Sequence, residues 1–158
     1  MAETTTEKEA YTAKELAEFM EMGVTTIRDV KGITDDEMDA IYTVAYNHYA
    51  VGHYEDAEAI FKFLVLFDHL NVSYWIGLGA TRQAQKKFKD ALAAYSNVVG
   101  NLDVKNFKAS YYAAECFLAL GDKENAAKAL ECVKAYADVK TEEGREFAVK
   151  AAKLAKLV

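Results

Sequence analysis

The chain has 158 residues, of which 52% are hydrophobic and 28% charged, and it carries a formal net charge of −6 and no proline. The negative charge argues against a nucleic-acid surface, which needs a basic stripe, and no run of about 18 apolar residues is present for a membrane span. Because proline breaks helix interiors, its absence favours an ordered, helical protein.

The N-terminal region begins with a polar, acidic stretch over residues 1–11. It lacks the apolar core of a signal peptide, so we expect a frayed end and a cytoplasmic protein. Thr12 and Glu15 have the spacing of a capping box, which begins a short helix. The apolar face of this helix consists of Leu16, Phe19 and Met20. Because a helix this short is not stable alone, we predict that these residues mediate self-association.

Three later segments repeat one pattern, in which a small residue is followed four positions later by a large one. The pairs are Ala57 and Phe61, Ala91 and Tyr95, and Ala126 and Leu130. Successive pairs lie 34 and 35 residues apart, and Trp75, Leu78 and Gly79 precede the middle pair. This period and residue order are typical of the tetratricopeptide repeat, a helix–turn–helix unit. One such unit cannot bury its own apolar face, so neighbouring units stack into a solenoid.

We therefore predict an all-α solenoid of three repeats, with an N-terminal helix before them and a C-terminal capping helix after them. A single domain of residues 12–158 is long enough to hold them. The expected repeats are 38–71, 72–105 and 107–140, with Asn106 as one inserted residue, and the capping helix is expected at about 141–157. A second capping box, at Thr34 and Glu37, opens the first repeat. Turns inside the repeats are expected at Gly52, Lys86 and Gly121.

The first helix of the first repeat carries two neighbouring stripes. The repeat pattern assigns one stripe to packing, and it consists of Ile41, Val44, Ala45 and His48. The other stripe consists of Tyr42, Tyr46 and Tyr49 and faces the concave surface that a solenoid leaves open. Its equivalents in the second and third repeats are Ile76, Ala80, Gln83, Tyr111, Glu115 and Leu118.

The composition of this concave stripe predicts an apolar peptide as the ligand. Repeat proteins that capture acidic peptide tails line the same stripe with Lys, Arg and Asn, and that clamp is missing here. Tyrosines instead offer rigid apolar faces with a hydroxyl at the rim, which suit an extended peptide with aliphatic anchors. A single tyrosine could equally well pack against a neighbouring helix, but three in a row on the open face favour binding.

Enzymatic and metal-binding functions have little support in the sequence. The histidines are His48, His53 and His69, and no two of them have ligand spacing on one helix face. Cys116 and Cys132 are too few for a disulfide framework, and we interpret them as reduced packing residues. No glycine-rich phosphate loop or nucleophile elbow is present. We therefore expect no catalysis, no metal and no cofactor.

Several segments are more specific than a generic repeat. They include residues 26–33 (TIRDVKGI), 52–57 (GHYEDA) and 74–83 (YWIGLGATRQ). In order and spacing over roughly residues 16–135, the chain resembles the class II type III secretion chaperones. These proteins escort the hydrophobic translocators of bacterial injection systems.

The resemblance implies a cytoplasmic, dimeric bacterial chaperone whose groove holds an extended translocator segment with spaced Pro and Leu anchors. In that family the groove tyrosines of the first repeat contact the client, and here they match Tyr42 and Tyr49, with Tyr54 near the turn. The N-terminal helix, here residues 12–22, takes part in dimerisation. Together with the stripe, the predicted peptide-binding set is Tyr42, Tyr46, Tyr49, Tyr54, Ile76, Ala80, Gln83 and Tyr111.

Two other functions stay open at this point. One is a generic tetratricopeptide adaptor that bridges two folded proteins. The other is a structural component of a secretion apparatus. For the protein itself we expect no nucleic-acid partner and no membrane insertion.

Overall fold

The computed structural model describes residues 12–21, 23 and 25–158, and the regular elements within them are all helical. The two N-terminal helices are α1 (Ala13–Glu21) and α2 (Ile27–Lys31). The repeats follow as α3 (Asp35–Ala50), α4 (Tyr54–Phe67), α5 (Val72–Ala84), α6 (Phe88–Asn97), α7 (Phe107–Ala119) and α8 (Lys123–Tyr136). A π-helical segment at Val98–Leu102 extends α6. The chain ends with α9 (Glu142–Leu154) and a 3-10 turn at Ala155–Leu157.

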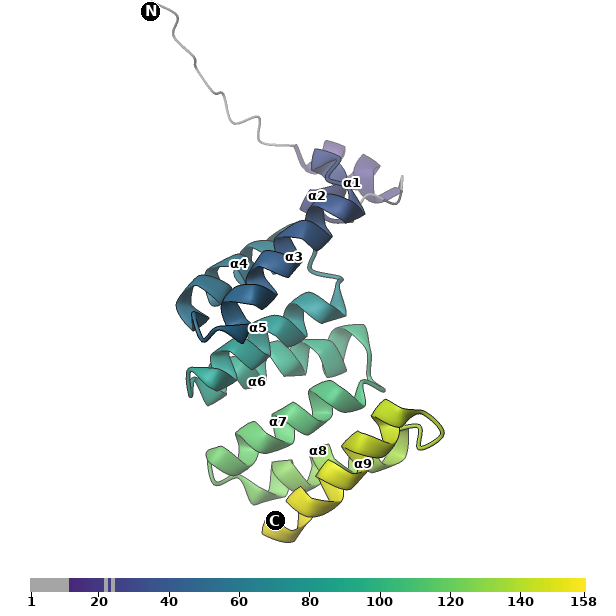
Figure 1. Ribbon diagram of the computed structural model, residues 1–158. Coiled ribbons are helices and arrows are strands. Elements are labelled where there is room, and N and C mark those ends of the chain that lie inside the picture. Colours follow the sequence, from purple (N-terminus) through teal and green to yellow (C-terminus); the bar gives the residue numbers. More distant parts are fainter. Residues whose placement is uncertain (1–11, 22, 24) are drawn as a thin grey trace, which may run out of the picture.

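The repeat helices form a stack of antiparallel pairs. Figure 1 shows α3 with α4, then α5 with α6, then α7 with α8, and α9 lies against the last pair. This arrangement confirms the predicted solenoid of three repeats with a helix at each end. None of the described helices combines the length and the apolar composition that a bilayer crossing requires.

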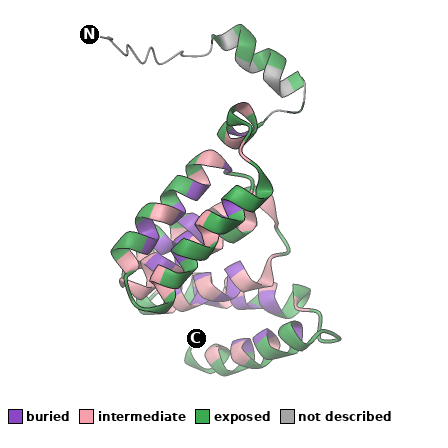
Figure 2. Ribbon diagram, turned by 45° about the horizontal axis from the view of Figure 1, so that its top comes forward, coloured by how far each residue is buried: buried purple, intermediate pink, exposed green. Residues whose placement is uncertain are grey.

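The N-terminal helix α1 stands apart from this stack in Figure 2. Its capping box forms as expected, since the amide of Thr12 donates to Glu15 at 2.7 Å and the amide of Glu15 donates to the Thr12 hydroxyl at 3.3 Å. The side chains of Leu16, Phe19 and Met20 lie outside the described part of the structure, as do residues 1–11. The dimerisation role of these three residues therefore stays a prediction.

Local hydrogen bonds explain where the repeat helices begin and turn. Thr34 and Glu37 form the expected capping box at the start of α3. Gly52 and Gly121 take left-handed backbone conformations, with φ of 85° and 78°, at the turns inside the first and third repeats. Lys86 takes the same conformation at the middle turn, with φ of 60°, although a side chain there is strained. All three turns fall where they were expected.

The position of the inserted residue was predicted wrongly. Asn106 is the N-cap of α7, as Asn71 is the N-cap of α5. In both turns an aspartate lies three residues before the Asn and accepts a hydrogen bond from a backbone amide. Leu70 donates to Asp68, and Lys105 donates to Asp103. The connecting turns are therefore equivalent, and the extra residue lies before them, in the π-helical segment. A π-helix accommodates one additional residue without breaking the helix.

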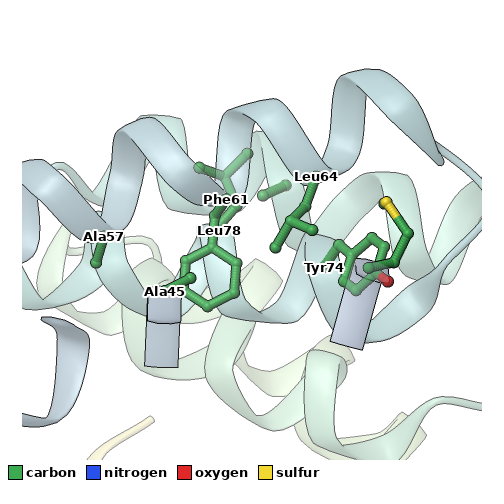
Figure 3. Close-up of a cluster of buried hydrophobic side chains, with 8 residues drawn as sticks. Ala45, Ala57, Phe61, Leu64, Tyr74 and Leu78 are labelled. Carbon is green, nitrogen blue, oxygen red and sulfur yellow. The ribbon is translucent and has the colours of Figure 1, made fainter. Parts of the chain in front are cut away.

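Small residues let the two helices of a pair approach closely around large side chains. Ala45 of α3 and Ala57 of α4 are fully buried, and Figure 3 shows them near Phe61. The expected packing stripe is wrong at Val44, which is 48% exposed, while Met38, two turns before Ala45, is fully buried. The core therefore lies closer to the Met38–Ala45 line of α3 than the sequence pattern indicated.

Candidate peptide-binding groove

A cavity of about 620 Å³ opens on one side of the first two repeats and reaches α7. Residues of α3, α5 and α7 meet there, joined by one residue each of α4 and α6 and by the middle turn. The lining residues are Tyr42, Tyr46, Tyr49, Phe61, Ile76, Gly77, Ala80, Gln83, Ala84, Lys86, Phe88, Tyr112 and Glu115. The cavity is thus mostly apolar and aromatic, with a few polar groups, which is typical of a ligand site.

Six of the eight predicted peptide-binding residues line this cavity. They are Tyr42, Tyr46, Tyr49, Ile76, Ala80 and Gln83. The helical spacing of four and three residues brings the three tyrosines onto one face of α3, as expected. Whether these residues contact a peptide stays a prediction.

The three tyrosines of α3 differ in how firmly they are held. The ring of Tyr42 packs edge-on against Phe61 at 5.8 Å and lies 5.9 Å from the ring of Tyr74. Burial raises the pKa of both Tyr42 and Tyr49. Tyr46 is 54% exposed and offers its ring to solvent. Tyr42 therefore packs in the core and also lines the groove, whereas Tyr46 mainly lines the groove.

A chain of hydrogen bonds forms the polar part of the cavity wall. The buried Tyr95 hydroxyl donates to Gln83 Oε1 at 2.9 Å, and Gln83 Nε2 donates to Glu115 Oε2 at 2.8 Å. These bonds fix the orientation of the Gln83 amide and connect α5, α6 and α7. Glu115 is half-buried, and its carboxylate keeps further acceptor capacity that could receive the N–H of a peptide backbone.

The structure places two predicted residues outside the cavity. Tyr111 is only 8% exposed, because its ring packs edge-on against Phe147 of α9 at 5.4 Å. Burial, and then a hydrogen bond to Glu115, raise the pKa of Tyr111 to about 12. Tyr54 lies beside the cavity, where its ring stands 5.7 Å from that of Tyr49. Tyr111 is therefore a core residue under the capping helix, whereas Tyr54 is half-buried beside the cavity, and its contact with a peptide stays a prediction.

Tyr112 and Phe88 line the cavity and were missed by the sequence analysis. Tyr111 and Tyr112 are adjacent aromatics, so helix periodicity alone cannot decide which one faces the groove. The sequence held one signal that could have decided between the two tyrosines. This signal is the apolar stripe of α9, which contains Phe147 and must pack on one face of the third repeat.

Comparison with known proteins finds both similar sequences and similar solved structures. No protein-family model matches the chain. Low calcium response locus protein H of Yersinia pestis is 35% identical over 105 residues, which cover 66% of this chain and 62% of the length of that relative.

Solved structures match over a larger share of both chains. The type III secretion translocator chaperone SycD of Yersinia enterocolitica has a TM-score of 0.80 and 29% identity, covering 85% of this chain and 98% of that one. PcrH in complex with the chaperone-binding region of PopB has a TM-score of 0.73 and 31% identity, covering 78% and 98%. PcrH comes from Pseudomonas aeruginosa.

Proposed function

The chain belongs to the family of type III secretion translocator chaperones, and we propose that it binds a translocator protein by holding an extended segment in the groove. Such a translocator carries membrane-inserting segments that would aggregate before secretion. Holding one segment through many modest contacts keeps the client soluble and secretion-competent without irreversible binding.

The observation that carries this proposal is the aromatic lining of the cavity. Tyr42, Tyr46 and Tyr49 of one face of α3 line the cavity together with the small or aliphatic Ile76 and Ala80 of α5. Rings with few rotatable bonds lose little entropy on binding, and the small residues leave room for aliphatic anchors of the peptide. PcrH is solved with the chaperone-binding region of PopB, which supports a peptide-binding role for the same fold here.

We further propose that the protein works in the bacterial cytoplasm as a non-enzymatic, single-domain chaperone spanning residues 12–158. In the absence of client it would form a homodimer through α1. A solved structure of SycD is described as an alternative dimer, which supports self-association in this family.

The proposal can be tested by co-expression of the full chain with a translocator from the same genome. We expect the two proteins to co-purify as a soluble complex, and the translocator alone to be insoluble. A chain that binds only folded partners and leaves the translocator insoluble would indicate the generic adaptor instead. A chain that co-purifies with membrane rings would indicate a component of the apparatus.

A further inference from the structure

Two histidines and an aspartate meet at the turn between α3 and α4, outside the groove. His48 lies in the last turn of α3, His53 is the N-cap residue of α4, and Asp56 lies in its first turn. Gly52, in its left-handed conformation, reverses the chain between them. Helix periodicity could not reveal this cluster, because its members lie on both sides of a turn.

The geometry of the cluster is close to that of a metal site. One ligand atom from each of the three residues lies within 4.8 Å of the other two. His48 Nδ1 is 3.8 Å from Asp56 Oδ2, and the two imidazole rings are 5.9 Å apart.

The hydrogen-bonding capacity of the ring nitrogen His48 Nδ1 is also unsatisfied. This nitrogen is a buried atom with no hydrogen-bond partner among the described residues, and its distance to Asp56 is too long for a hydrogen bond. A buried polar atom without a partner costs free energy, so an unpaired ring nitrogen calls for an explanation. A cation between His48 and Asp56 would satisfy both groups.

We propose that His48, His53 and Asp56 bind one divalent transition-metal ion, with zinc as the best fit. Imidazole nitrogen and carboxylate oxygen are common zinc ligands, and three protein ligands leave a fourth position for water. Tetrahedral coordination brings ligand atoms to about 3.3 Å from one another, given metal–ligand distances of about 2.0–2.1 Å. The side chains of His53 and Asp56 are exposed and can rotate by the small amount required.

Binding at this place would join the end of α3 to the start of α4. The turn lies between the negative end of the α3 dipole and the positive end of the α4 dipole, so the two helix dipoles offset one another there. Because the ion binds the folded turn and not an unfolded chain, it would stabilise the first repeat by mass action. The site is independent of the proposed peptide binding.

The test is a zinc titration of the untagged, chelator-treated full chain by isothermal calorimetry, followed by thermal unfolding with and without zinc. We expect saturation at one equivalent, micromolar affinity and a higher melting temperature with zinc. His53→Ala and Asp56→Asn should each weaken binding at least tenfold. His53 makes no side-chain capping hydrogen bond, so its replacement leaves α4 capped as before.

His69→Ala is the matched control, because it removes a histidine from a different turn. Its affinity for zinc should equal that of the unchanged chain. The proposal is overturned if no saturable binding occurs below millimolar zinc. It is equally overturned if His53→Ala and His69→Ala bind zinc alike, which would indicate adventitious surface binding or a simple His48–Asp56 ion pair.

Discussion

Glu58 is a buried carboxylate that connects the first repeat to the second. Four donors surround it, at 2.8 Å from Lys87, 2.9 Å from Gln85, 3.1 Å from Arg82 and 3.3 Å from Lys62. Burial raises the pKa of Glu58, but these hydrogen bonds more than offset that effect and lower the pKa to about 2. The charged form is therefore strongly preferred in the folded protein.

We expect Glu58→Gln to destabilise the protein by about 1–3 kcal/mol at neutral pH, since it removes charge-assisted hydrogen bonds from a buried site. The carboxyl of Glu58 has a lower pKa in the folded protein than in the unfolded chain, where the pKa is near 4.5. The ionised group therefore stabilises the folded protein above about pH 4.5, and this contribution is lost as the pH falls toward 2. The difference in unfolding free energy between the two proteins should therefore be constant above pH 5 and shrink below it. Urea unfolding from pH 7 to pH 3 measures this difference, and a difference that does not change with pH would contradict the account.

Among individual residues, the sequence predicted the cavity-lining positions well on α3, where the tyrosines form a single stripe. It predicted them poorly on α7, where two adjacent tyrosines are candidates for the same face. The spacing of Tyr42, Tyr46 and Tyr49 determines that they share a face, and the structure agrees. Tyr111 and Tyr112 are equally plausible from their types. In the structure both rings pack edge-on against Phe147, at 5.4 Å and 5.8 Å, and only Tyr112 lines the cavity. Long-range packing of this kind is not encoded in local periodicity.

At the scale of helices, the approach of α5 to α6 depends on Gly79. A Cβ atom added there would come within 2.5 Å of the fully buried ring of Tyr95. We expect Gly79→Ala to cost about 1–3 kcal/mol, the range typical of overpacked cores. Gly100→Ala is the control, because its Cβ would meet no atom of the described residues within 4 Å. Thermal melts of both variants test this expectation, and an equally stable Gly79→Ala would show that Tyr95 can move aside.

The repeat period predicted the pairing of helices and the three turns, because small and large residues recur at fixed offsets. It did not predict α2, whose five residues are too few for periodicity and begin at an unrecognised capping box of Thr26 and Asp29. It also placed the inserted residue at Asn106, because a π-helical segment leaves no mark in the repeat pattern. Irregularities that depend on backbone hydrogen bonding are thus the least visible features in the sequence.

For the whole molecule, the apolar pattern of α1 leads to a prediction about its oligomeric state. We expect Phe19→Glu to convert a client-free dimer to a monomer, because a charge on the predicted apolar face cannot be buried against a second copy. Helical content should stay nearly unchanged, since α1 stands apart from the repeat stack. Sedimentation velocity measures the change, with Glu18→Ala as a control on the same helix. A Phe19→Glu protein that still sediments as a dimer would place the interface elsewhere.

The most direct test of the groove is a peptide titration of Tyr46→Ala beside Val44→Ala. These residues lie two positions apart on α3 and are similarly exposed, at 54% and 48%, but only Tyr46 lines the cavity. Loss of an aromatic anchor removes about 2 kcal/mol or more of binding free energy, so Tyr46→Ala should weaken binding of an extended translocator peptide more than tenfold. Val44→Ala should bind as the unchanged chain does, and both variants should melt as it does. Equal peptide affinities for the two variants would contradict peptide binding in this groove.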